Sequence, residues 1–166
     1  MLVEFAAEQA GTPYLPKNLS PVGLAAFPQI MRDAMERGSA ETLADGLAND
    51  AYWNTHETYL REGVVRDRKI NVRQASERLA VGEFLAWYTR ALSSRLIAEG
   101  IEACEVYRAA DPKWAPGECA EHEGAILDPG DVYEGHRARY WPEPGRDDMV
   151  SVPFGPGCHH TIRRVS

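Results

Sequence analysis

The sequence feature that most constrains this fold is a long helical pattern between Asn71 and Gly100. Its apolar residues recur in steps of three and four, which is the spacing of one face of an α-helix. They are Val81, Phe84, Leu85, Tyr88, Leu92 and Leu96. Asn71 followed by Gln74 matches a helix-capping arrangement, and Gly100 stands where a left-handed C-terminal cap is expected. The pattern therefore predicts one long helix over residues 71–100.

Three residues inside this helix indicate what surrounds it. Trp87 and Leu79 lie off the apolar stripe, so we expect the helix to contact more than one surface. Gly82 costs about 1 kcal/mol in a helix interior, which favours a position where another backbone approaches closely. Both features suit a central helix or a helix used in assembly.

The chain before the long helix is interpreted as two parts. Residues 1–22 contain Pro13, Pro16 and Pro21, so we expect an extended arm in which only the first ten residues hold a helical turn or two. Residues 23–100 are predicted to be a helical region that ends with the long helix.

Shorter elements are expected within the helical region. A helix is predicted from Pro28, which suits a first helical position, to Gly38, and Ser39 is expected to cap a second helix. The aromatic-rich segment Tyr52–Leu60 is interpreted as a helix or helical turn that Gly63 closes.

After Gly100 the helical spacing gives way to short alternating runs between turn-forming residues, which indicates strands. The expected strands cover residues 101–108, 125–127, 149–152 and 161–165, with a helical turn or loop over 132–138. Residues 101–166 are therefore predicted to form a small β-rich, turn-rich C-terminal module. The fold class is α+β: an N-terminal arm and helices with one long central helix, followed by this module, for which zinc is a candidate staple.

Metal-ligating side chains are concentrated in this module. All three cysteines and four of the five histidines lie between Cys104 and His160. Structural zinc sites join thiolates and imidazoles from two turns, and the sequence offers one pair in Cys119 and His122 and a second in Cys158 and His160. His160 is preferred to His159 because alternate residues of an extended segment point to the same side. The spacing predicts zinc bound by Cys119, His122, Cys158 and His160, with Cys104 spare.

Two other interpretations of the same residues remain open. Cys104 and Cys158 are also explained as small buried apolar residues, with the histidines bonded to backbone groups. The Cys/His cluster also suits a small zinc-dependent nuclease or hydrolase, in which His136, beside Arg137 and Arg139, is the candidate base. No signature of a known thiol-enzyme family surrounds either Cys119 or Cys158.

Composition excludes several classes of function. The formal net charge of −7 argues against a general coat for nucleic acid, because phosphate binding needs a local cationic surplus. An odd number of cysteines without a visible export signal argues against a disulfide framework and favours reduced thiols or metal thiolates in the cytoplasm. No apolar stretch approaches the roughly 18 residues that a membrane span needs.

The C-terminal module also resembles a known family. Cys119-Ala120-Glu121-His122-Glu123-Gly124 follows a helix and a strand, and Pro153-Phe154-Gly155-Pro156-Gly157-Cys158-His159-His160 closes the module. This arrangement is similar to the C-terminal part of the phage Mu F-type minor head proteins, the head-morphogenesis family of tailed bacteriophages. The usual closing pattern of that family is Asn-Cys-Arg-Cys, so a metal site carries over only with Cys158 and one histidine in place of two cysteines.

The resemblance implies a structural protein of the virion, assembled in the host cytoplasm, with no enzymatic activity. It implies a minor capsid or head–tail connector component that acts near the portal during head assembly. The expected partners are portal, capsid and connector subunits, with a homo-oligomer or ring, no membrane and no specific nucleic-acid binding.

Overall fold

The computed structural model describes residues 1–110, 118–155 and 157–165, and it divides the chain into two compact units. The first unit joins Met1–Tyr14 to Val81–Ser166, and the second is Leu15–Ala80. The boundary falls within the long helix α4 (Val72–Ala98). The predicted α+β class is confirmed, with helices, one long helix and small antiparallel sheets. None of the described helices is both long and apolar enough to cross a bilayer.

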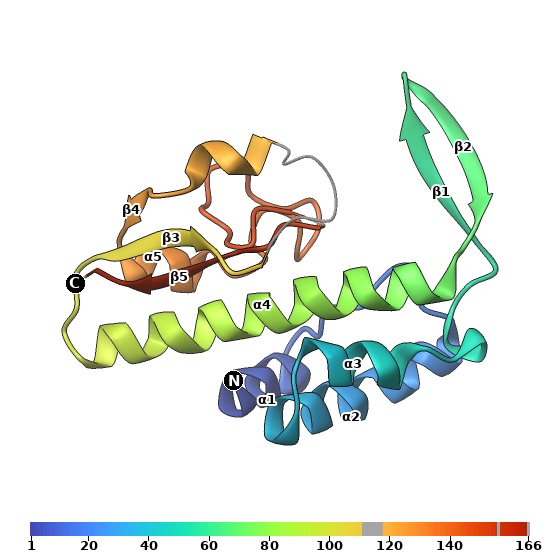
Figure 1. Cartoon of the computed structure of the whole chain (residues 1–166), viewed down its shortest axis with the longest axis horizontal. Helices are drawn as coiled ribbons and strands as arrows, with labels where there is room; N and C mark the ends of the chain where they lie inside the picture. The colour runs from blue at the N-terminus through green and yellow to red at the C-terminus, as the bar shows by residue number, and fades with distance from the viewer. Residues whose placement is uncertain (111–117, 156, 166) are drawn as a thin grey trace. The chain divides into compact units, whose positions relative to one another are not determined.

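The first unit contains a three-stranded antiparallel sheet in the order β4-β3-β5 (Figure 1). Its strands are β3 (Cys104–Arg108), β4 (Ile126–Leu127) and β5 (His160–Arg164). The short helix α5 (Pro129–Glu134) follows β4, and the Asp128 carboxylate caps it by accepting from Gly130 N at 2.6 Å. The strands predicted over 101–108, 125–127 and 161–165 are thus confirmed within a residue or a few.

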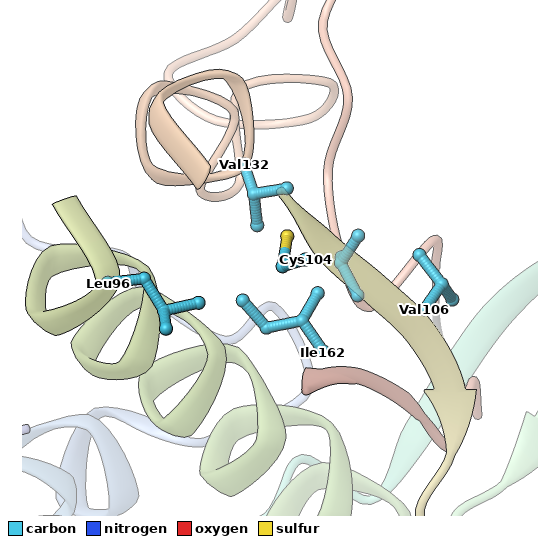
Figure 2. Close-up of a cluster of buried hydrophobic side chains, with 6 residues drawn as sticks. Leu96, Cys104, Val106, Val132 and Ile162 are labelled. Carbon is cyan, nitrogen blue, oxygen red and sulfur yellow. The ribbon is translucent and has the colours of Figure 1, made fainter. Parts of the chain in front are cut away.

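The hydrophobic core of this unit gathers side chains from four elements. Figure 2 shows Leu96 of α4, Cys104 of β3, Val132 of α5 and Ile162 of β5 converging, and all four are at most 2% exposed. Val106 and Val152 complete the buried cluster. The alternate residues Cys104 and Val106 of β3 both face this core.

The predicted strand over 149–152 is wrong, since no strand is assigned to these residues. The reason lies in the hydrogen bonds of Ser151. Its hydroxyl donates to the Gly135 carbonyl and accepts from Arg139 N. The segment is bonded to the turn after α5 instead of to the sheet.

Helix α4 begins and ends as its sequence predicts. Asn71 Oδ1 accepts from Gln74 N at 3.1 Å, and Gly100 has a left-handed φ of 67°. The buried face differs from the predicted stripe. Leu96 is the only residue of the stripe that is fully buried, and Tyr88 is 39% exposed. The face that is buried consists of Ser76, Ala80, Glu83, Ala86, Trp87, Thr89, Ser93 and Leu96.

Helix α1 (Leu2–Ala10) belongs to the first unit and packs on α4. Phe5 meets the Trp87 ring edge-on, with ring centroids 5.3 Å apart, and both side chains are almost fully buried. Glu4 accepts from Arg90 Nε at 2.8 Å and from the Tyr133 hydroxyl at 2.9 Å. A helix therefore lies within the first ten residues, where the sequence predicted a helical turn or two. Trp87, placed off the stripe by the sequence, is the centre of this packing.

The second unit is built from two capped helices and a hairpin. The elements are α2 (Pro21–Arg37), α3 (Ala40–Leu47), the 3₁₀ turn η1 (Asp50–Tyr52), β1 (His56–Arg61) and β2 (Val64–Lys69). Phe27 and Met31 of α2 and Leu43 and Leu47 of α3 are buried, and Trp53 Nε1 donates to the Leu47 carbonyl at 2.8 Å.

Two predictions in the second unit are wrong. Helix α2 begins at Pro21 instead of Pro28, because the Ser20 side chain caps it by accepting from Gly23 N. The segment expected to be helical before Gly63 forms strand β1, paired with β2 (Figure 1). Glu62 and Gly63 both have positive φ, 53° and 75°, which is the conformation of a two-residue hairpin turn.

Candidate metal centre

Three of the four predicted ligands lie together. Cys119 is in the 3₁₀ turn η2 (Glu118–His122), Cys158 precedes β5, and His160 is the first residue of β5. One ligand atom from each falls within 4.8 Å of the other two. His160 is fully buried, Cys158 is 4% exposed and Cys119 is half-buried. These residues form a group that could hold a metal ion.

Local backbone geometry places the two C-terminal ligands. Gly157 adopts a φ of 78°, a left-handed conformation that glycine takes at low cost, and Cys158 N donates to the Gly155 carbonyl. The chain then enters β5, where alternate side chains share a face. His160 Nδ1 consequently lies 3.3 Å from Cys158 Sγ.

Pairing with β3 brings the η2 turn to the same place. Arg108 of β3 is opposite His160 of β5, and Gly124 N, just after η2, donates to the Val106 carbonyl at 2.8 Å. Both ends of the group are therefore bonded to one strand. The sheet register sets the distance between Cys119 and His160.

Without a metal ion, the surroundings of the group keep its thiol and imidazole uncharged. Burial raises the pKa of the Cys158 thiol, and the neighbouring Cys119 raises it further, against the hydrogen bonds from the His160 and Phe154 backbone. Burial and the Arg108 charge lower the pKa of His160, which keeps the imidazole neutral. The raised pKa favours the protonated thiol of Cys158. A bound divalent cation would reverse this, because a thiol that coordinates a metal is deprotonated.

His122, the fourth predicted ligand, is turned elsewhere. Its ring stacks on Phe154, with centroids 4.2 Å apart and planes at 20°. It also lines a small pocket of about 140 Å³ with Arg139, Ser151 and other residues. His122 is not in the group of three, and its role as a ligand stays a prediction.

The other reactive side chains of the module lie outside the group. Cys104 is in the hydrophobic core, where its thiol donates to the Leu127 carbonyl at 3.4 Å and burial raises its pKa to about 11. Among the described residues, His159 Nδ1 is buried without a hydrogen-bond partner. His136, the candidate nuclease base, belongs to a second cluster around α4.

That second cluster was not apparent from the sequence, which offered His136 only as a candidate base beside Arg137 and Arg139. Arg137 is only 2% exposed and donates to both carboxylate oxygens of Glu83 at 2.8 and 2.6 Å, and its Nε lies 3.3 Å from Glu8. His136 packs against Trp87 at a centroid distance of 4.6 Å. Burial lowers the pKa of His136 to about 4, although Glu8 at 3.7 Å opposes the shift.

Sequence reasoning also missed two residues beside the metal-ligand group. Glu123 Oε2 lies 3.6 Å from His160 Nε2, and Arg108 holds the same oxygen from Nε at 3.2 Å and Nη2 at 3.1 Å. The available signal was the acid directly after Cys-x-x-His. Its relevance depends on the register that places Arg108 opposite His160.

Comparison with known proteins yields no relative: no family model, no curated protein and no solved structure matches this chain.

Proposed function

We propose that this chain is a structural protein of a tailed-phage virion whose C-terminal module is stapled by zinc. The observation that carries the proposal is the meeting of Cys119 with Cys158 and His160. These residues belong to the two motifs on which the resemblance to phage minor head proteins rests. A minor capsid or head–tail connector subunit needs a rigid surface to present to its neighbours. A staple between the η2 turn and β5 supplies that rigidity.

Zinc is the metal that the donor set favours. Thiolate and imidazole ligands suit zinc, and sites with two or more thiolates are typical of structural, closed coordination. His122 is the proposed fourth ligand, which requires its ring to leave Phe154. The metal then links η2 to the turn before β5 without a place for substrate.

Two experiments test this function on the purified chain. Light scattering after size exclusion is expected to give an assembly of several chains, in the form of a homo-oligomer or ring. Limited proteolysis is expected to cut within residues 119–160 faster after zinc is chelated. Cys119→Ser should reproduce the effect of the chelator, whereas Cys104→Ser should leave zinc protection intact. A monomer at all concentrations, with proteolysis unaffected by chelation, contradicts the proposal.

A second candidate is a small zinc-dependent nuclease or hydrolase. The pocket lined by His122, Arg139 and Ser151 favours it, because an imidazole and a guanidinium beside a metal centre are suited to a phosphodiester. Zinc-dependent DNA cleavage that is lost in His122→Ala but kept in His56→Ala would support this candidate. If the zinc-loaded protein cleaves no DNA, the nuclease candidate is excluded and the structural role is retained.

A further inference from the structure

We propose that Glu123, itself held by Arg108, positions the imidazole of His160 so that Nδ1 is the metal-binding nitrogen. The proposal rests on the metal centre proposed above and assigns two further residues to it. Neither Glu123 nor Arg108 would touch the metal. Each acts through His160.

The orientation of the His160 ring carries the first step. Nδ1 faces the thiols, since it lies 3.3 Å from Cys158 Sγ. The His160 backbone N–H also lies 3.4 Å from that sulfur, so the chain approaches the thiol closely. Of the two ring nitrogens, Nδ1 is therefore placed for a metal bound between Cys119 and Cys158.

The second step concerns the other ring nitrogen. Nε2 of His160 is buried and has no hydrogen-bond partner among the described residues, a state that costs free energy. Glu123 Oε2 lies 3.6 Å from Nε2, which is slightly beyond hydrogen-bond distance. A small movement of the imidazole ring towards Glu123 would close this gap. A metal on Nδ1 fixes the proton on Nε2 and makes it a stronger donor. We expect the Nε2–Oε2 distance to shorten to an ordinary hydrogen bond when metal binds.

The third step is what holds Glu123 in place. Arg108 contacts Glu123 Oε2 through both Nε and Nη2, and its side chain is 18% exposed. The register of β3 and β5 places Arg108 beside His160, and the Gly124–Val106 hydrogen bond fixes the backbone next to Glu123. The same carboxylate oxygen, Oε2, thus accepts from the guanidinium and lies 3.6 Å from the imidazole Nε2.

A carboxylate that accepts from a metal-bound histidine orients the ring and raises its basicity, and removing such a partner weakens metal binding by about 10- to 100-fold. Zinc affinity of the full chain, measured by competition with a chromophoric chelator, is expected to fall by that factor in Glu123→Gln. Glu121→Gln is the matched control, because this neighbouring acid is exposed, and it should bind zinc like the parent. Arg108→Gln should weaken binding in the same direction and serves if Glu123→Gln does not fold.

Two spectroscopic readouts separate positioning from a merely structural role. Long-range ¹H–¹⁵N spectra of the zinc-loaded parent should show His160 metallated at Nδ1 and protonated at Nε2. In cobalt-loaded protein, both the thiolate-to-cobalt bands and the ligand-field bands should be the same in the parent and in Glu123→Gln.

Several results would overturn the inference. Metal on Nε2, or unchanged zinc affinity in Glu123→Gln, excludes the positioning role while the metal centre stands. Altered cobalt ligand-field bands in Glu123→Gln would make Glu123 a ligand. Failure of the parent protein to bind zinc or cobalt at all overturns both the centre and this inference.

Discussion

Replacing Arg137 with methionine removes the guanidinium that faces two buried carboxylates. Glu83, which is 6% exposed, loses hydrogen bonds of 2.8 and 2.6 Å, and Glu8 loses a charge at 3.3 Å. Breaking a buried ion pair from one side costs about 3–5 kcal/mol, because the remaining charge stays buried without a partner. For a chain of this size that loss corresponds to a fall in Tm of roughly 10 °C.

Urea unfolding followed by circular dichroism measures this loss directly. The matched control is Arg163→Met, since Arg163 also grips a carboxylate, Glu105, with two hydrogen bonds but is 56% exposed. The control should lose much less unfolding free energy than Arg137→Met, because solvent screens an exposed pair. The double variant Arg137→Met with Glu83→Leu should recover a substantial part of the lost stability. Equal losses of unfolding free energy in Arg137→Met and Arg163→Met would contradict the larger cost expected for the buried ion pair.

Three further predictions follow from the same structure. Because burial keeps His136 neutral with a pKa of about 4, against 6.5 as its ordinary value, the unfolded chain takes up its proton first as the pH falls. Stability should therefore drop by roughly 3 kcal/mol between about pH 6.5 and pH 4, and in urea unfolding His136→Gln should flatten that part of the pH profile; an unchanged slope would exclude His136 as its cause. Gly63→Ala should destabilise the hairpin by about 1 kcal/mol because Gly63 has a φ of 75°, whereas Gly82→Ala should stabilise the chain by about 0.5–1 kcal/mol; thermal melts that rank the two the other way contradict the backbone assignment. Zinc chelation should lower the Tm of the parent protein but not that of Cys158→Ser. Equal falls in Tm in both proteins would show that Cys158 is not a ligand of the stabilising metal.

The long helix could be predicted from the sequence because its spacing and both of its ends depend on nearby residues. Its buried face could not, because that face includes polar side chains whose partners are distant in sequence. Thr89 Oγ1 lies 2.8 Å from Thr161 Oγ1, and Glu83 meets Arg137. A hydropathy pattern counts such residues as exposed, whereas hydrogen bonding makes their burial acceptable.

Gly82 illustrates the same limit of local reasoning. The cost of glycine inside a helix suggested close approach by another backbone, but a Cβ built there meets nothing within 4 Å among the described residues. The expected approach is therefore wrong at Gly82. It occurs instead at Gly23, where an added Cβ would overlap the Tyr52 backbone.

The metal-ligand group was partly predictable. Residue type and the two-residue alternation of an extended chain were enough to pair Cys158 with His160 and to place Cys119 on the facing turn. The contributions of Glu123 and Arg108 could not be predicted, because they depend on the register between β3 and β5. The sequence offered a buried apolar position for Cys104 as one of two interpretations, and the covering of one face of β3 by α4 and α5 places it in the core.

The most direct test of the metal centre is the zinc content per chain of the purified protein, measured by native mass spectrometry on the parent and on single variants. The proposed metal centre predicts one zinc per chain in the parent and in Cys104→Ser, and loss of that zinc in Cys119→Ser, Cys158→Ser and His160→Gln. Zinc retained after both Cys119 and Cys158 are replaced, or a parent protein that binds none, would contradict it.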